Sequence, residues 1–282
     1  MNQAISQRSK TALRLTIGAI LFLSFVTNPV SMVNGEEKAG KSWPAAQRVS
    51  YGEIDHGNYH QLLQKYVDAN GAVNYKAWHG NQADRTALQN YLAELGKADQ
   101  SRQSTKPDQL AYWINAYNAL TIEGILRVYP TTTIRNHTPK LAGYNIWKDL
   151  KLTSGDQTVS LNHIEHEILR KMGEPRIHFA IVCASISCPR LLNEAYLGNS
   201  LEQQLTTNTR DFFSRNQNLR VDAAGKTLHL SAIISWFGSD FGKTQLDQLK
   251  MLAPYFPQEA KTLLAAGGYR IKFLDYDWNL NE

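Results

Sequence analysis

The sequence predicts an α+β fold, a helix-rich single domain with a small mixed sheet. Amphipathic stretches at helical spacing occupy most of the chain, and the few strand-like runs are short and separated by helices. With 43% hydrophobic residues and no internal repeat, a chain of 282 residues is long enough for one large buried core. We assign residues 1–35 to a signal peptide, residues 36–55 to a flexible N-terminal lead and residues 56–282 to the domain.

The first 35 residues have the pattern of a secretory signal. Arg8, Lys10 and Arg14 form a basic start, and residues 15–26 form an apolar core that is too short for a confident membrane span. We therefore expect an exported protein, periplasmic or secreted, cleaved near Gly35 and without a stable membrane span afterwards. An uncleaved N-terminal anchor is the alternative.

Charge argues against a nucleic-acid partner. Cleavage of the signal removes three basic residues and lowers the formal net charge from +5 to +2, which leaves no strong basic field for binding phosphates. A small molecule or a peptide is the expected ligand. No cofactor is indicated, and the sequence does not define the oligomeric state.

Helical spacing and turn residues place the elements in order. Helices are expected at residues 59–67, 83–95, 107–129, 162–171, 190–196, 201–213, 231–237, 246–252 and 259–264. Strands are expected at residues 72–75, 158–160, 179–182, 219–221, 227–230 and 269–274, the fourth and fifth forming a hairpin. Residues 131–155 form a long excursion, a type of segment that often carries binding surfaces. The aromatic tail, residues 275–281, is expected to pack down.

The longest expected helix contains two asparagines on one side, Asn115 and Asn118. Asparagine is a poor residue for a helix interior, so each side chain is expected to bond to another element, because a buried amide without a partner costs on the order of 1–3 kcal/mol. A structural brace and a direct role in chemistry are both consistent with this pattern.

Both cysteines of the chain lie in one segment, residues 176–191. The apolar run 179–182 predicts a strand buried on both faces, followed by a turn and by a short helix opening at Pro189. Cys188 would then be the N-cap, where the helix dipole lowers a thiol pKa. Alternatively, Cys183 and Cys188 close a small structural disulfide.

The expected helix 162–171 carries three polar side chains of interest. Asn162 followed by Glu165 is typical of a helix start, and Asn162, His166 and Arg170 form a polar stripe at four-residue spacing. Taken alone, Glu165 is a capping residue and His166 a solvated one.

Several segments together resemble the family named domain of unknown function 547. The motifs are residues 112–121, residues 160–170 with Ile164-Glu165-His166 and Arg170, residues 176–189, Ser235-Trp236-Phe237 with Asp240-Phe241, and residues 276–281. They extend over residues 59–281. The resemblance implies that Asn115, Asn118, Glu165, His166, His178, Cys183 and Cys188 belong to recurring motifs, and it implies no activity.

The first functional hypothesis is a thiol-dependent hydrolase or acyl transferase of papain-like type. Cys188 or Cys183 would be the nucleophile, His166 or His178 the base, and Glu165 or Asn115 the group that orients the imidazole. Asn118, Trp113, Trp236, Asp240 and Arg170 are the candidate ligand-binding residues.

The alternative is a non-enzymatic module of the cell envelope that binds a ligand or a protein and has a structural disulfide. Trp113, Trp147, Trp236 and Trp278 would line its groove, although such residues are more often core. A metal site is a weaker third hypothesis, since two cysteines five residues apart lack the usual zinc spacing, and we expect none.

Overall fold

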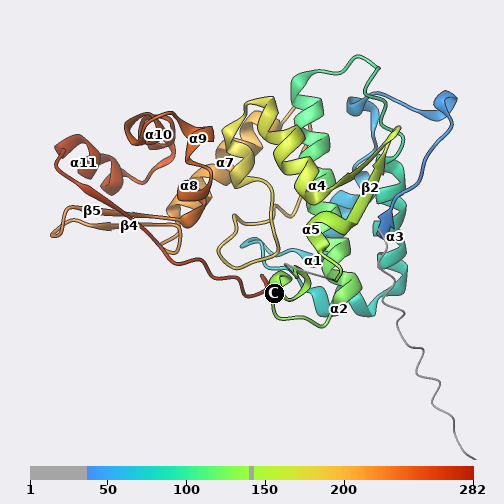
Figure 1. The fold of residues 1–282 in the computed structure, drawn as a ribbon, viewed down its shortest axis with the longest axis horizontal. Helices are drawn as coiled ribbons and strands as arrows, with labels where there is room; N and C mark the ends of the chain where they lie inside the picture. Colours follow the sequence, from blue (N-terminus) through green and yellow to red (C-terminus); the bar gives the residue numbers. More distant parts are fainter. Residues whose placement is uncertain (1–36, 140–142) are drawn as a thin grey trace, which may run out of the picture. The chain divides into compact units, whose positions relative to one another are not determined.

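The computed structural model describes residues 37–139 and 143–282, and the predicted signal peptide lies outside these residues. The predicted α+β class is confirmed. Helices dominate, and the structure contains two three-stranded mixed sheets where the sequence analysis expected one (Figure 1). Among the described residues, no helix is long and apolar enough to cross a membrane.

The two sheets are built from strands near and far in sequence. In the first, β2 (Leu150–Ser154) pairs in parallel with β1 (Glu37–Ala39) and antiparallel with β3 (Gln157–Ser160). In the second, β5 (Thr227–Leu230) pairs antiparallel with β4 (Leu219–Asp222) and in parallel with β6 (Arg270–Phe273). The predicted hairpin and the predicted strand near the C-terminus therefore share one sheet.

Most predicted helices are present with similar bounds. The α-helices are α1 (Gly57–Tyr66), α2 (Tyr75–Gly80), α3 (Gln82–Leu95), α4 (Lys106–Val128), α5 (Ile146–Asp149), α6 (Leu161–His163), α7 (Leu201–Ser214), α8 (Ala232–Trp236), α9 (Gly238–Phe241), α10 (Gln245–Leu252) and α11 (Gln258–Ala266). A π-helical turn, Ile164–Leu169, and a 3-10 turn, Arg170–Met172, continue α6. Other 3-10 turns are Ala45–Gln47, Tyr51–Glu53, Ile134–His137, Pro175–Phe179 and Ala253–Tyr255.

Helix α4 is the centre of the larger core. Its start is defined by Thr105, whose hydroxyl accepts the N–H of Asp108, and by Pro107 in the first turn. From Leu110 to Leu126 every residue is buried, so α4 is covered on all sides by other elements. Any polar side chain on α4 must therefore find its partner inside the protein.

A second core forms between α7, the β4–β5–β6 sheet and the C-terminal helices. Its fully buried members are Phe179, Phe212, Phe213, Leu228, Leu252 and Ala260. Strands β4 and β5 and helices α8 to α11 gather together in orange and red (Figure 1). Phe179 belongs to the cysteine segment, which contributes residues to both cores.

The predicted strand 179–182 is wrong, although its four residues are buried as expected. Side-chain amides, and not a neighbouring strand, bond its backbone. Asn118 donates to the carbonyl of Ala180 at 3.0 Å and accepts the N–H of Val182 at 2.9 Å. Asn208 of α7 donates to the carbonyl of Phe179 at 2.5 Å.

The predicted helix 190–196 is also absent, for the same physical reason. Asn115 donates to the carbonyl of Tyr196 at 2.8 Å and accepts its N–H at 2.9 Å. Asn208 donates to the carbonyl of Arg190 at 3.1 Å. The cysteine segment is thus an irregular loop between α4 and α7, and Cys188 is not a helix N-cap.

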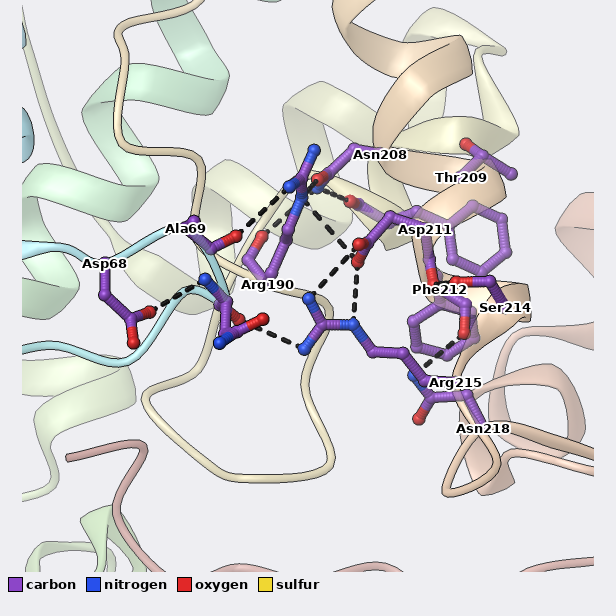
Figure 2. Close-up of polar contacts among 12 residues, drawn as sticks. Asp68, Ala69, Arg190, Asn208, Thr209, Asp211, Phe212, Ser214, Arg215 and Asn218 are labelled. Carbon is purple, nitrogen blue, oxygen red and sulfur yellow. Dashed lines mark hydrogen bonds and ion pairs between the residues drawn. The ribbon is translucent and has the colours of Figure 1, made fainter.

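Arg190 fixes this loop to α7 (Figure 2). Its Nε donates to Asn208 Oδ1 at 2.8 Å, and its Nη1 donates to the carbonyl of Ala69 at 3.2 Å. Asp211 accepts from Arg215 at 2.8 Å and lies 3.6 Å from the Nε of Arg190. The residues that follow Cys188 are therefore held to α7 and to the turn after α1.

Three smaller expectations are also corrected. Residues 72–75 form no strand, only a bridge between Val67 and Val73, and Tyr75 opens α2. Ser160 caps α6 in place of Asn162, accepting the N–H of His163. The region 131–155 was predicted to be a long loop, but it contains a 3-10 turn, α5 and β2.

Candidate functional site

A cavity of about 300 Å³ opens beside the cysteine loop. Its lining includes five predicted catalytic residues and one predicted ligand-binding residue: Cys183, Cys188, Glu165, His166, His178 and Trp236. The π-helical turn after α6 supplies Glu165 and His166, and the 3-10 turn Pro175–Phe179 supplies His178. Separate elements thus bring together most of the residues selected from sequence.

The two sulfur atoms are in direct contact at the cavity wall. Both cysteines are free thiols, and their Sγ atoms lie 2.6 Å apart. Ala184, between Cys183 and Ser185, has a φ of 58°, in the left-handed region that alanine seldom adopts. This turn places the N–H of Cys183 3.1 Å from the Sγ of Cys188, to which it donates. The loop geometry therefore directs a backbone donor at one particular sulfur.

Two hydroxyl groups complete the surroundings of Cys188. Its Sγ lies 3.2 Å from Ser185 Oγ and 3.1 Å from Tyr276 OH, and these two oxygens are 2.8 Å apart. Each hydroxyl has one proton, and either Ser185 or Tyr276 can donate to the sulfur, directly or through the other hydroxyl. Cys188 thus accepts from a backbone N–H, a thiol and a hydroxyl.

These contacts make the two thiols unequal. Burial acts to raise the pKa of Cys188, but the hydrogen bonds from Cys183, Ser185 and Tyr276 outweigh it and hold the pKa below its ordinary value. The hydrogen bond with Cys188, together with burial, raises the pKa of Cys183 well above its ordinary value. These contacts therefore favour ionisation of Cys188 over ionisation of Cys183.

Neither sulfur has a hydrogen bond to an imidazole within residues 37–139 and 143–282. His178 instead donates from Nε2 to Asp240 Oδ2 at 2.8 Å and stacks on Phe237 with ring centroids 4.1 Å apart. Burial lowers the pKa of His178 to about 4, so its ring is neutral near neutral pH. Cys188, His178 and Glu165 thus border one cavity, but no chain of hydrogen bonds between described residues connects them.

Asp240 connects His178 to two further predicted residues. Arg170 donates to both carboxylate oxygens of Asp240, at 2.6 and 2.8 Å, and its Nη1 lies 3.0 Å from the Nδ1 of His166. The hydrogen bonds from Arg170 lower the pKa of Asp240 to about 2. Since the guanidinium has no acceptor, His166 accepts at Nδ1 and its other nitrogen carries the proton.

Glu165 is the group in the cavity best suited to move a proton. Burial raises its pKa above the ordinary carboxyl value, while the neighbouring His166 and the hydroxyl of Tyr117 act in the opposite direction. The Tyr117 hydroxyl donates to Glu165 Oε2 at 3.2 Å. A raised pKa makes a carboxyl group a better candidate to give a proton and to take it back later.

The remaining wall of the cavity is aromatic. Trp236 is 49% exposed and stacks on Trp278 with centroids 5.7 Å apart, while Tyr276 lies 4.8 Å from Trp236. Trp147 and Phe237 also line this wall. A half-exposed tryptophan held by two other rings offers a flat apolar surface to a ligand.

Five predicted site residues do not line the cavity: Arg170 and Asp240, which bond to its histidines, and Asn115, Asn118 and Trp113. Asn115 and Asn118 use both ends of their amides to hold the cysteine loop, as described above, and neither lines the cavity. Trp113 is 3% exposed in the larger core, 4.9 Å from the ring of Tyr112. The structure places the asparagines as braces behind the site and Trp113 away from it.

Sequence reasoning missed two residues that touch the sulfurs, Ser185 and Tyr276. Ser185 could have been suspected from its position between the two cysteines, and Tyr276 from its position in the aromatic tail. The tail was expected to pack against the domain, and the bridge between Ser185 and Leu280 confirms this. Tyr117 was also missed, since its spacing on α4 indicated only a core position. No group of metal-ligating side chains occurs among the described residues.

Comparison with known proteins places the centre of the chain in a family. Residues 101–213, which include α4, the cysteine loop and α7, match the family model described as "Protein of unknown function, DUF547". The match is shorter than the region 59–281 over which the motifs extend. No curated protein and no solved structure matches the chain.

Proposed function

We propose, for a chain whose residues 101–213 form a DUF547 family domain without an assigned function, that it is a thiol-dependent hydrolase or acyl transferase with Cys188 as nucleophile. The observation that carries this proposal is the set of donors converging on one sulfur at a cavity wall: the Cys183 N–H, the Cys183 thiol and the Ser185–Tyr276 hydroxyl pair. Such donors favour a thiolate, which is the reactive form of cysteine.

The first step needs no histidine at the sulfur. The Cys188 thiolate attacks the carbonyl carbon of a bound acyl compound and forms a C–S bond, while the bond between that carbon and the leaving group breaks. In this step Glu165, whose pKa burial raises, acts as the general acid and gives its proton to the leaving group. The products of this step are a thioester on Cys188, a carboxylate on Glu165 and the free leaving group.

The second step restores the site. Glu165, now ionised, removes a proton from water, or from the hydroxyl of an acyl acceptor, as the oxygen attacks the thioester carbon. The C–S bond breaks, and Cys188 leaves as the thiolate that its donors stabilise. Glu165 is protonated again, so each turnover returns both groups to their starting states.

The cavity favours a small substrate with an apolar ring or chain next to its acyl group. Its volume is about 300 Å³, and its aromatic wall at Trp236 borders the same space as the sulfurs. Lys148, Asn145 and Asn162 are the polar residues of the lining that remain to orient such a ligand. Export by the predicted signal peptide forms part of the proposal.

An activated ester provides the test, because it acylates a reactive thiol and releases a coloured alcohol. We expect p-nitrophenyl acetate to give a rapid burst of nitrophenol, with one acetyl group on the peptide that contains Cys188, followed by slower turnover. Cys188→Ser should abolish the burst. Glu165→Gln should keep acetylation of the thiolate and slow turnover by roughly a hundredfold, the lower end for loss of an acid–base group.

Glu167→Gln is the matched control for Glu165→Gln. Glu167 lies on the same π-helical turn, but its carboxylate is half exposed and pairs with Lys171 outside the cavity. Turnover equal to wild type in the Glu167 variant and reduced in the Glu165 variant supports the proposal. Binding of aromatic ligands without any covalent labelling of Cys188 would favour the ligand-binding module and overturn the enzyme.

A further inference from the structure

Acyl transfer requires one sulfur, yet the structure places two in contact. We propose that Cys183 and Cys188 also act together as a dithiol pair that reduces small disulfides bound in the cavity, Cys188 attacking first and Cys183 completing the exchange. This activity shares with the proposed function only the thiolate of Cys188, whose side chain is buried and borders the cavity. It does not depend on Glu165 or on an acyl substrate.

Neither cysteine lies in a strand or a helix, and the loop that holds the two sulfurs together is anchored at both ends to helices. Cys183 follows Val182, whose N–H is bonded to Asn118, and Arg190 is fixed to α7 two residues after Cys188. Between these anchors the N–H of Cys188 donates to the carbonyl of Ser185 at 3.1 Å, closing a tight turn. Both sulfurs are therefore held at one place on the cavity wall, and no rearrangement of the loop is needed to bring them into contact.

Reaction of Cys188 should lower the pKa of Cys183. The pKa of Cys183 is raised first of all by its hydrogen bond with Cys188 and also by the charge of that sulfur. When Cys188 becomes part of a mixed disulfide, it loses its negative charge and with it this effect. Cys183 then ionises more readily, at the stage when a second thiolate is needed.

The hydroxyl donors can serve either sulfur. Ser185 Oγ lies 3.3 Å from the Sγ of Cys183 as well as 3.2 Å from that of Cys188, and Tyr276 OH lies 3.3 and 3.1 Å from the same two atoms. The donors that stabilise the Cys188 thiolate can therefore rotate to stabilise a thiolate on Cys183. A donor set built for a single nucleophile would not need to contact both.

The exchange is balanced in two steps. The Cys188 thiolate attacks one sulfur of the substrate disulfide, forming a mixed disulfide and releasing the other half as a thiolate. Cys183 then gives up its proton and attacks the Sγ of Cys188, which releases the second half of the substrate as a thiolate. The pair has lost two electrons and become a disulfide, and the substrate has gained them as two thiolates, one of which, or water, takes the proton that Cys183 gave up. An external dithiol would reduce the pair again.

Dithiobis(nitrobenzoic acid) is a suitable probe, since it is an aromatic disulfide that fits the cavity wall and each half absorbs visible light when released. We expect the full chain to release two thionitrobenzoate anions per molecule and to end as an unlabelled protein lighter by two hydrogens. Cys183→Ser should release one anion and keep the other half bound to Cys188. Cys188→Ser should react more slowly than either.

Each result has a definite meaning. Wild-type protein that ends with a stable adduct on Cys188, or with one adduct on each sulfur, would overturn the inference and leave the acyl-transfer proposal standing. Failure of Cys188 to react with this probe or with an activated ester would overturn both. The wild-type measurement by intact mass suffices for this decision if a serine variant fails to fold.

Discussion

The Oδ1 of Asn118 accepts the N–H of Val182 at 2.9 Å, and this bond joins the most buried helix of the protein to the residue that precedes Cys183. The Nδ2 of the same side chain donates to the carbonyl of Ala180. One amide on α4 therefore replaces the neighbouring strand that an extended buried segment ordinarily requires.

Replacing Asn118 with leucine should destabilise the protein by roughly 1–3 kcal/mol for each of the two backbone groups left without a partner. The free energy of unfolding, measured by urea denaturation, should fall accordingly, and labelling of Cys188 should become less selective as the loop loosens. Asn90→Ala, at an exposed position on α3, is the control and should change stability by less than about 0.5 kcal/mol. A stable Asn118→Leu variant would show that the loop is held by other contacts.

Removing the hydroxyl of Tyr276 should reduce the reactivity of Cys188. Tyr276→Phe keeps the ring in the aromatic wall but deletes a donor to the sulfur, so the pKa of Cys188 should move upward toward its ordinary value. Loss of a hydrogen bond to a charged group costs about 1.5 kcal/mol, which raises the pKa by about one unit, so alkylation by iodoacetamide should slow roughly tenfold at a pH below the midpoint and by less near neutral pH. The rate measured against pH should show a higher midpoint. An unchanged profile would mean that the Cys183 contacts alone keep Cys188 ionised.

Two tryptophans selected from sequence should behave differently when replaced with alanine. Trp113 is 3% exposed, so Trp113→Ala should cost about 3–5 kcal/mol of unfolding free energy. Trp236 is 49% exposed, so Trp236→Ala should cost much less but raise the KM for an aromatic ester with little change in the rate of acetylation at saturation. Denaturation and steady-state kinetics on the two variants check this contrast. Equal stability losses would contradict the assignment of Trp236 to the cavity wall.

Acid should destabilise the fold through two buried histidines. Burial lowers the pKa of His178 and of His56 to about 4, below the value of roughly 6.5 in the unfolded chain. As the pH falls between these values, the unfolded state binds protons that the folded state does not, so the free energy of unfolding decreases by up to about 1.4 kcal/mol per pH unit for each histidine.

His178→Gln should remove the share of this pH dependence that belongs to His178 while leaving that of His56. Glutamine can still donate to Asp240, which limits other losses. The measurement is urea denaturation at several values across that acidic range, with His163→Gln at an exposed position as control. A slope unaltered in His178→Gln would indicate that this ring is already charged in the folded protein.

Most of the longer helices, the β4–β5 hairpin and several residues of the cavity could be anticipated from local patterns, whereas the pairing of β6 with β5 could not. Periodicity identified α4 and α7, and the hairpin signal identified β4 and β5. The apolar run 179–182 indicated that this segment is buried, but the structure of residues 179–196 could not be anticipated. Asn118 and Asn115, which bond to the backbone of this segment, are more than sixty and more than eighty residues away in sequence from the residues that they bond. Such contacts cannot be predicted from the conformational preferences of neighbouring residues.

The same limit applied to the sulfur chemistry. The low pKa of Cys188 was expected from a helix dipole, and the structure assigns it to Cys183, Ser185 and Tyr276 instead. The direction was right and the cause was wrong, since the cause depends on an aromatic residue 88 positions further along the chain.

That distance has a consequence for biosynthesis. The loop with both cysteines is made well before residues 276–281, yet Tyr276 and the bridge from Leu280 to Ser185 complete its surroundings. While the protein is still being translated, the thiols lack their final neighbours and remain in the ordinary, mostly protonated form. The contacts of Tyr276 with Cys188 and Ser185 therefore form only when the last segment docks on the loop.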